Sequence, residues 1–240
     1  MSWSLIVHAH SRHSYDGVGD PAALVEEAIR LGVHALAITD HDTWQGSLEA
    51  AEYARVHDRP LLVIPGAEVF TDQGDVLALF VDEDPGPRFA LELCDAVRAR
   101  GGVTVLPHPC RYRSPIPDLV GRVDLIEVFN ARTPRTANAF AQVLADASGK
   151  LATVAPDAHR VAELGLARMV FAGAPPASLD DVREALLHAP RTFDARGGSI
   201  WDEWRSQVIK LTRRPDPGLA VHLARGVVRR LVKPGEYRAT

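Results

Sequence analysis

Histidine and carboxylate side chains recur in this 240-residue chain at the ends of short apolar runs. An early run ends in His8 and His10, and the run at residues 36–38 is followed by Asp40 and His41. Alternate residues of a strand point the same way, so both imidazoles of a His-x-His pair can bind one transition metal. Charged groups are rarely buried without a partner or a metal. These residue types therefore predict metal chemistry at strand ends.

The same arrangement follows three further apolar runs. Their terminal residues are Glu68, then His108, then Asp157 with His159. In α/β barrels, the carboxyl ends of the strands hold the polar groups that carry out the chemistry. Five strand ends that each supply His, Asp or Glu are hard to explain as ordinary core residues, so we expect one shared metal site.

Short buried strands that alternate with helices must position these side chains. Strands are expected at residues 4–9, 35–39, 61–68, 74–81, 103–106, 125–129, 151–155 and 167–172. Helices are expected at residues 22–31, 47–57, 89–100, 135–148 and 178–188. Asp20 before Pro21 is a plausible N-cap, and Ser178 with Asp181 resembles a capping box. The alternation favours an α/β fold with a parallel sheet, and the number of units favours a barrel.

The character of the chain changes after Gly197-Gly198. Residues 199–213 and 219–232 have the apolar spacing of two amphipathic helices. Residues 195–240 carry ten Lys or Arg and four Asp or Glu. Residues 1–194 carry 17 Lys or Arg and 27 Asp or Glu. We expect a barrel at 1–194 and a basic helical extension at 195–240 that packs on it. An Arg-rich polar face also allows a membrane-surface role, which we favour less.

Composition narrows the class of protein. The formal net charge of −4 gives no general argument for binding nucleic acid. Two cysteines cannot form a disulfide framework, which favours a reducing compartment. The start of the chain does not resemble a signal peptide, and no apolar run approaches the ~20 residues of a membrane span. We expect a cytoplasmic protein with no membrane partner; its oligomeric state has no signal in the sequence.

Taken together, these motifs resemble the PHP (polymerase and histidinol phosphatase) family. The matching pieces are His8-Ala9-His10 with Asp16-Gly17, Ile38-Thr39-Asp40-His41-Asp42, Gly66-Ala67-Glu68, Pro107-His108-Pro109 and Asp157-Ala158-His159. The resemblance covers about residues 4–194. It implies a distorted seven-stranded, TIM-like (β/α) barrel that holds two or three metal ions, and family activities are mostly phosphoester hydrolysis.

The resemblance also implies which residues bind each ion. One ion would lie between His8, His10, Glu68 and Asp157. A second would share Glu68 and use His108, and a third would take Asp16, His41 and His159. Where the family often has a histidine after glycine, this chain has Gly74-Asp75. Asp75 can ligate through oxygen, or it can be a turn residue that opens a strand.

The ions themselves are expected to be divalent. The candidates are Mn²⁺, Zn²⁺, Fe²⁺ and Mg²⁺, and an oxygen donor at Asp75 favours Mn²⁺ or Mg²⁺ over Zn²⁺. Such ions can bind a phosphate oxygen, activate water and stabilise a leaving oxygen. We therefore expect a metal-bound hydroxide to hydrolyse a small phosphomonoester, such as a nucleotide, a sugar phosphate or an amino-alcohol phosphate, and to release phosphate. The general acid would be His159, Asp40 or a metal-bound water.

A phosphate substrate also needs cationic donors, and Arg has a planar fork that suits phosphate oxygens. Five arginines lie within a few residues of the candidate ligands: Arg12, Arg111, Arg113, Arg132 and Arg160. We name Arg12, Arg132 and Arg160 as substrate-binding, and favour the last two because they lie close to strand ends. Two alternatives stay open. One is a nuclease on short oligonucleotides, and the other is a non-catalytic metal-binding regulatory module.

Overall fold

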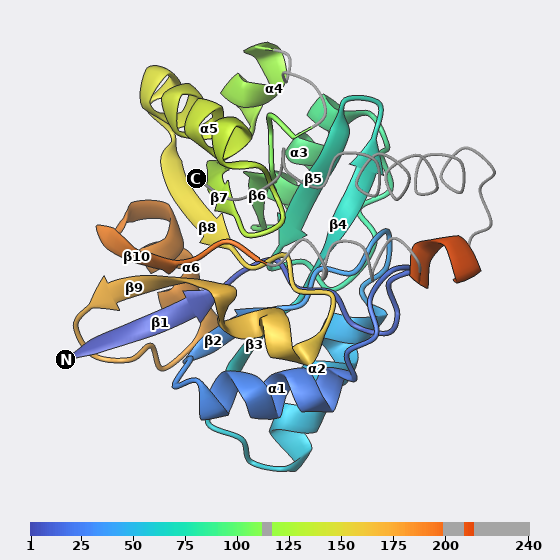
Figure 1. The fold of residues 1–240 in the computed structure, drawn as a ribbon, viewed down its shortest axis with the longest axis vertical. Coiled ribbons are helices and arrows are strands. Elements are labelled where there is room, and N and C mark those ends of the chain that lie inside the picture. The colour runs from blue at the N-terminus through green and yellow to red at the C-terminus, as the bar shows by residue number, and fades with distance from the viewer. Residues whose placement is uncertain (112–116, 199–208, 214–240) are drawn as a thin grey trace, which may run out of the picture.

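The computed structural model describes residues 1–111, 117–198 and 209–213, which form a mixed α/β fold with two five-stranded sheets (Figure 1). The first sheet has the order β10 (Arg191–Ala195), β9 (Ala167–Ala172), β1 (Ser2–Ile6), β2 (Ala35–Ala37), β3 (Leu62–Ile64). The second has the order β4 (Gly66–Thr71), β5 (Gly74–Leu79), β6 (Val103–Leu106), β7 (Leu125–Asn130), β8 (Leu151–Ala155). The helices are α1 (Pro21–Arg30), α2 (Gln45–Val56), α3 (Ala90–Ala99), α4 (Pro117–Arg122), α5 (Arg135–Ser148), α6 (Leu179–His188) and the 3-10 helix η1 (Val161–Leu166).

The expected parallel sheet is confirmed only in part. Strands β1, β2 and β3 are parallel, as are β6, β7 and β8, but β4-β5-β6 and β1-β9-β10 are antiparallel. Only two residues separate β4 from β5. A parallel connection needs a crossover of about a dozen residues or more, so this link can only be a hairpin. Gly74 provides the positive φ, 111°, at its end.

The strand expected at residues 61–68 is in fact two strands. It breaks at Pro65, and β3 and β4 on either side belong to different sheets. Proline has no backbone N–H to continue a ladder. A Cβ on Gly66 would lie 2.6 Å from the carbonyl oxygen of Ala78, so glycine allows β4 to approach β5 closely. This break moves Glu68 into the second sheet.

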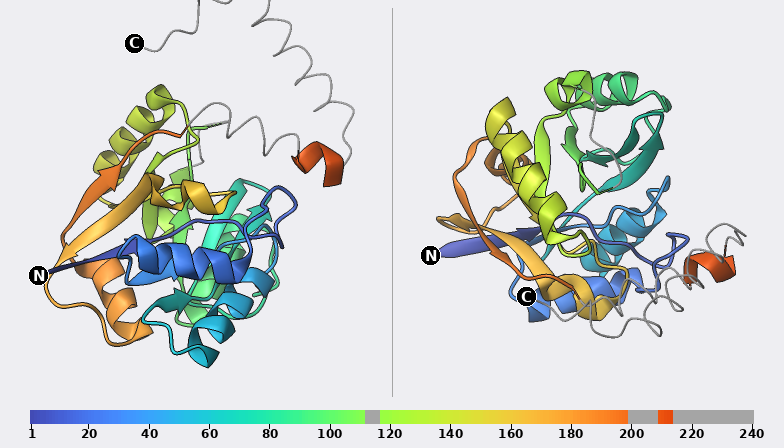
Figure 2. Two further views of the ribbon diagram at one scale, coloured as in Figure 1. Left: turned by 60° about the horizontal axis from the view of Figure 1, so that its bottom comes forward. Right: turned by 45° about the horizontal axis from the view of Figure 1, so that its top comes forward.

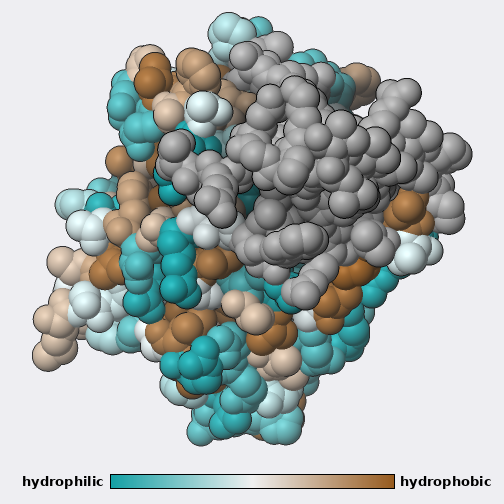
Figure 3. Space-filling model, in the orientation of Figure 1, coloured by the Kyte–Doolittle hydropathy of each residue, from teal (hydrophilic) through white to brown (hydrophobic). Residues whose placement is uncertain are grey.

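The predicted helix caps are confirmed. Asp20 accepts a hydrogen bond from the Ala22 N–H at 2.9 Å, and Pro21 is the first residue of α1. Ser178 and Asp181 form the capping box of α6. Helices α1 and α2 cover the first sheet, and α3 and α5 pack on the second (Figure 2). The visible face of α1 and α2 is mainly hydrophilic (Figure 3), as the amphipathic pattern predicts.

The two sheets meet just beyond the carboxyl ends of β1, β2 and β8 and at the amino half of β4. Isolated bridges pair Ala9 with Ala158 and His41 with Glu68. The backbone N–H of His10 donates to the Ala158 carbonyl at 2.7 Å, which strengthens the first junction. The closed barrel of seven strands is not confirmed, because the described residues form ten strands in two sheets. The candidate ligands on the two sheets nevertheless lie close together, as one shared site requires.

Strand β10 was not predicted, nor were α4 and η1. Strand β10 pairs with β9 at the edge of the sheet and is mostly exposed, so it lacks the apolar alternation that identifies a strand. Beyond it, the N–H groups of Arg196 and Gly198 donate to the carbonyls of Leu166 and Ala131, both at 2.8 Å. Of the helices expected at 199–213 and 219–232, residues 209–213 are described and are helical; the rest lies outside the described residues. No helix within the described ranges has the length and apolarity needed to cross a membrane.

Candidate metal centre

Three of the candidate ligands have an unusual backbone conformation. His8, His108 and Asp157 have φ angles of 74°, 29° and 48°. Non-glycine residues rarely adopt this left-handed region, and each such residue costs about 1–3 kcal/mol unless its surroundings hold it. The three residues follow the ends of β1, β6 and β8 by two residues each. The chain turns sharply there and brings the three side chains into one cluster.

The first group of ligand atoms lies at the centre of this cluster. Oε2 of Glu68 is 3.2 Å from Nε2 of His8 and 3.3 Å from Nε2 of His10. Oδ1 of Asp157 is 3.5 Å and 3.3 Å from the same two nitrogens. All four side chains are buried. Two imidazole nitrogens and two carboxylate oxygens thus face one another, as a single cation would require.

The second group shares Glu68 and adds Asp75 and His108. Nε2 of His108 lies 3.1 Å from Oε1 of Glu68, so this carboxylate uses its two oxygens on two different groups. Asp75 offers an oxygen within 4.8 Å of both partners. Burial, followed by the charge of Glu68, raises the pKa of Asp75 to about 6. A cation bound between these three residues would favour the ionised form of Asp75 and so offset both effects.

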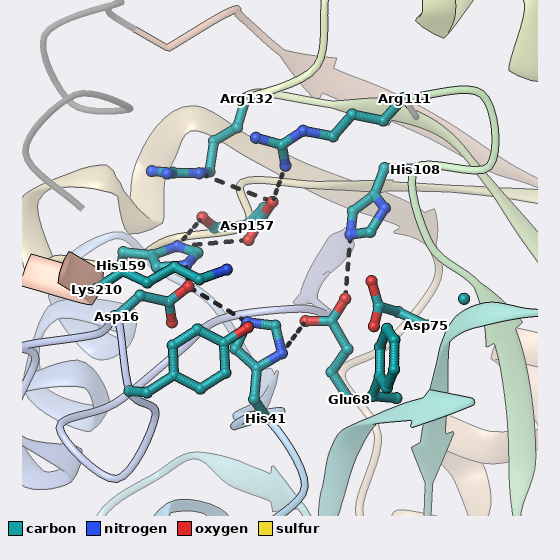
Figure 4. Close-up of a pocket in the computed structure, with 13 residues that line it drawn as sticks. Asp16, His41, Glu68, Asp75, His108, Arg111, Arg132, Asp157, His159 and Lys210 are labelled. Carbon is teal, nitrogen blue, oxygen red and sulfur yellow. Dashed lines mark hydrogen bonds and ion pairs between the residues drawn. The ribbon is translucent and has the colours of Figure 1, made fainter. Parts of the chain in front are cut away.

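The third group consists of Asp16, His41 and His159, with His10 shared from the first. Oδ2 of Asp16 lies 3.4 Å from Nε2 of His41 and 3.2 Å from Nε2 of His159. Figure 4 shows these side chains pointing toward Glu68 and Asp157 across one pocket. Because Glu68 and His10 each belong to two groups, the three groups form one continuous cluster.

The buried charges of the cluster stabilise one another. Burial lowers the pKa of His8, but the Glu68, Asp157 and Glu127 carboxylates outweigh it and raise this pKa well above its usual value. Burial also lowers the pKa of His10, but the carboxylates of Asp157 and Glu68 outweigh this effect and raise the pKa to about 10. Burial raises the pKa of Glu68, but the neighbouring histidines hold it well below its usual range. The site therefore needs positive charge, which protons or metal ions can supply.

Two buried polar atoms that lack a hydrogen bond support the metal interpretation. Nε2 of His10 and Oδ1 of Asp16 are buried and make no hydrogen bond within the described part of the chain. Buried polar atoms normally have partners. The donors are imidazole nitrogens and carboxylate oxygens without thiolates, a set that suits Mn²⁺, Fe²⁺, Zn²⁺ or Mg²⁺. The residues present therefore fit bound divalent ions.

The family model for the PHP domain matches residues 7–198 of the chain. The chain belongs to the PHP family. An uncharacterized protein of Methanocaldococcus jannaschii is 30% identical over 142 residues, which are 52% of this chain and 80% of that protein. The 5'-3' exoribonuclease Rnm of Escherichia coli is 42% identical over 65 residues, 27% of this chain and 22% of that enzyme.

A solved structure from Bacteroides vulgatus has the same fold as this PHP domain. It is a two-domain protein containing a predicted PHP-like metal-dependent phosphoesterase. It aligns with a TM-score of 0.69 at 19% identity, over 82% of this chain and 65% of the other. The chain thus spans about two thirds of that protein.

Glu127 is a residue of this PHP domain that the sequence reasoning missed. Its carboxylate lies 2.9 Å from Nδ1 of His8, accepts from the His108 N–H at 2.8 Å, and accepts from the Asn130 side-chain amide at 2.9 Å. A carboxylate on Nδ1 fixes the tautomer that presents Nε2 to a metal. Glu127 could have been recognised as an acidic residue inside the apolar strand β7. A buried carboxylate needs partners, so its position indicates a polar site nearby.

The structure places the predicted general acid Asp40 away from the pocket. Its two carboxylate oxygens accept from the backbone N–H and the hydroxyl of Ser11, both at 2.6 Å. A Cβ on Gly46 would lie 1.9 Å from Oδ2 of Asp40, so the carboxylate is also tightly packed. Asp40 anchors the loop after β1 and is not among the residues that line the pocket. These contacts favour a role for Asp40 in anchoring the loop over the expected role as proton donor.

The predicted substrate-binding arginines have different positions. Arg132 lines the pocket, as does Arg111, which was considered but not selected. Arg12 instead pairs with Asp20 and Glu49, and Nε of Arg160 lies 2.7 Å from Oε1 of Glu163; neither is among the pocket-lining residues. Arg113 lies outside the described residues. The loop conformations, which the sequence does not reveal, decide this outcome.

The pocket is a cavity of about 400 Å³ above the cluster. Its lining contains ligand candidates from all three groups, the two arginines, and the aromatic residues Tyr15 and Phe70. Nη1 of Arg111 and Nε of Arg132 lie 3.3 Å and 3.8 Å from Oδ2 of Asp157 (Figure 4). A volume of this size suits a small molecule.

Proposed function

We propose that this PHP domain is a metal-dependent phosphoesterase that hydrolyses a small phosphomonoester. The observation that carries the proposal is the continuous cluster of three ligand groups at the floor of a cavity of about 400 Å³. Arg111 and Arg132 line the same cavity, so anion-binding groups and metal-binding groups face one space. Nucleotides, sugar phosphates and amino-alcohol phosphates are of a size that this space accepts.

Two or three divalent ions would be held by the residues of the three groups. These residues are His8, His10, Asp16, His41, Glu68, Asp75, His108, Asp157 and His159. When bound, such ions supply Lewis acidity at a phosphoryl oxygen and produce a nucleophile from water at neutral pH. Glu127 orients His8 from behind, and the shared carboxylate of Glu68 sets the spacing of neighbouring groups.

The arginines bind and orient the phosphoryl group. The side chains of Arg111 and Arg132 are 9% and 5% exposed, so the surrounding protein limits their motion. A buried guanidinium beside a phosphate forms charge-assisted hydrogen bonds of fixed direction. Their contacts with Asp157 place this positive charge directly above the metal ligands.

We assign His159 to metal binding rather than to proton donation. Burial lowers its pKa, and the charges of His10 and Arg132 lower it further. An imidazole with a lowered pKa is neutral at pH 7, which suits a ligand and disfavours a general acid. Asp40 is outside the pocket, so a water molecule is the remaining proton donor of those considered.

Phosphate release from a panel of phosphomonoesters, nucleotides and short oligonucleotides tests the proposal. The assay uses the whole chain with added Mn²⁺, beside a Glu68→Ala control whose metal content and fold are measured. We expect release from at least one monoester by the wild type and none by the control. Metal-loaded wild-type protein that releases nothing from the entire panel would indicate a non-catalytic regulatory module.

A nuclease acting on short oligonucleotides is the second candidate. The similarity to E. coli exoribonuclease Rnm favours it. The cavity of about 400 Å³ holds roughly one nucleotide, so we rank it below the monoesterase. Faster turnover of oligonucleotides than of any monoester, with salt-dependent binding, would reverse this order.

A further inference from the structure

A short helix at residues 209–213 lies beside the loop that carries Asp16 (Figures 1 and 2). Nη1 of Arg213 donates to the backbone carbonyls of Ser14 and Gly17, both at 2.8 Å, and to that of Arg12 at 3.4 Å. Three carbonyl acceptors around one guanidinium fix the helix against this loop. Residues 209–213 therefore have a defined position beside the metal centre.

This position places Lys210 in the lining of the pocket. Its Nζ lies 4.9 Å from the ring centroid of Tyr15. That ring stacks on His41, with the centroids 4.5 Å apart and an angle of 8° between the planes. Figure 4 shows the Lys210 side chain extending into the pocket beside Asp16 and His159. The aromatic contact holds the ammonium at the mouth of the third ligand group.

Lys210 differs from the two pocket arginines in its contacts. Arg111 and Arg132 both lie close to Oδ2 of Asp157, at 3.3 Å and 3.8 Å. Lys210 makes no hydrogen bond or ion pair with any residue that the structure describes. An ammonium has three donors, and a tyrosine face satisfies none of them by a hydrogen bond. The three donors of the Lys210 ammonium are therefore available to bind an anion that enters the pocket.

Lys210 also lies beyond residue 198, where the match to the family model ends. We propose that Lys210 is a substrate-binding residue, whose ammonium binds a non-bridging oxygen of the substrate phosphoryl group from a wall that the family domain does not supply. This inference rests on the proposed phosphoesterase function. Arg213 is then a positioning residue, because it holds the helix that carries Lys210.

The competing explanation is that Lys210 only balances the carboxylates of the metal centre. That role predicts changes in metal content or stability when the charge is removed. A substrate contact instead predicts a change in affinity for phosphate groups while the metal content stays constant. Kinetics combined with direct binding separate the two roles.

The experiment compares the wild type with Lys210→Met and Lys210→Arg in the full chain loaded with Mn²⁺. KM and kcat are measured with p-nitrophenyl phosphate, binding of inorganic phosphate by calorimetry, and metal content by elemental analysis. We expect Lys210→Met to raise KM and the phosphate Kd about tenfold, the effect of losing one charge-assisted hydrogen bond. Lys210→Arg should recover most of this loss, and metal content should not change.

Two further variants sharpen the result. Arg213→Gln should raise KM like Lys210→Met, because it releases the helix. Arg55→Met removes an exposed positive charge whose ion pair among the described residues is with Glu52 on α2, and should leave KM unchanged. Equal phosphate affinity in the wild type and Lys210→Met, or a loss of metal in the latter, overturns the proposal. A wild type that binds phosphate but hydrolyses nothing instead overturns the proposed function, and phosphate binding then still decides the role of Lys210.

Discussion

The loop between β1 and α1 contributes to two clusters of charged side chains that differ in burial. His10 and Asp16 lie in the buried metal centre, where each has a polar atom without a hydrogen bond among the described residues. Arg12 and His13 lie on the outer side and pair with carboxylates, the latter at 2.7 Å from Glu49. His10 and His13, three positions apart in one loop, thus have opposite environments.

The difference shows that residue type and sequence position do not define a site. The side chains of the outer cluster form ion pairs with one another and are partly exposed to solvent. The inner cluster concentrates histidines and carboxylates away from water and leaves buried donors and acceptors unmatched, which is a state that a bound cation completes. We propose that the buried cluster carries the function, and the substitutions below test this contrast.

The largest effect should come from Asp157→Asn in the inner cluster. Asp157 faces His8, His10 and both pocket arginines. Loss of this charge should cost several kcal/mol of transition-state stabilisation, or about 10³-fold in kcat/KM, together with lower metal content. Steady-state kinetics and elemental analysis measure both. Activity within tenfold of the wild type would remove Asp157 from the site.

Glu127→Gln should have an intermediate effect, because Glu127 contacts His8 rather than the pocket. Partners of ligand histidines typically contribute about 10–100-fold to metal affinity or activity. We expect a loss of that size, and excess Mn²⁺ should restore much of it. Titration of activity with Mn²⁺ makes the measurement. A loss that no metal concentration recovers would argue against an orienting role.

Gly46→Ala tests whether Asp40 belongs to the scaffold. The new methyl group would meet Oδ2 of Asp40 at 1.9 Å and Oγ of Ser11 at 2.4 Å. We expect a loss of stability of about 1–3 kcal/mol, as for other overpacked sites. Thermal unfolding measures it, and the folded fraction should retain its KM. Gly121→Ala is the matched control, because among the described residues no atom outside its own helix backbone and chain neighbours lies within 4 Å of a Cβ there.

The smallest effect should follow Arg12→Met in the outer cluster. The Arg12 side chain is 40% exposed, and exposed ion pairs contribute about 0–1 kcal/mol. We expect unfolding within that range of the wild type and an unchanged kcat/KM. Arg132→Met provides the contrast, since its KM should rise. Equal effects of the two substitutions on KM would contradict the distinction between the clusters.

The residues brought together by the fold were largely predictable, and the reason is geometric. His8, His41, His108 and Asp157 follow strand ends, and such ends converge whether the sheet is closed or divided in two. Glu68 was expected at a strand end but is the third residue of β4. The split at Pro65 and the hairpin between β4 and β5 were not predictable from apolar runs alone. These features depend on which strands pair, and pairing is a tertiary property.

The sequence did not distinguish some residues of the site from neighbouring residues that lie outside it. Asp40 stands beside His41 in the chain, but its carboxylate turns toward Ser11. Arg111 lines the pocket while Arg160 does not, because the loops that follow their strands take different courses. Glu127 was hidden by the apolar residues around it in β7. In each case side-chain direction, rather than residue type, decides the role.

The seam between the two sheets has a consequence for stability. His8, His10 and His41 follow strands of the first sheet, whereas Glu68, Asp75, His108 and Asp157 belong to or follow strands of the second. An ion held by both sets is a crosslink between two halves of the molecule. At a free-ion concentration about 100 times its Kd, it adds about 2.7 kcal/mol to the free energy of unfolding. The melting temperature of the protein should then rise with the free concentration of the ion.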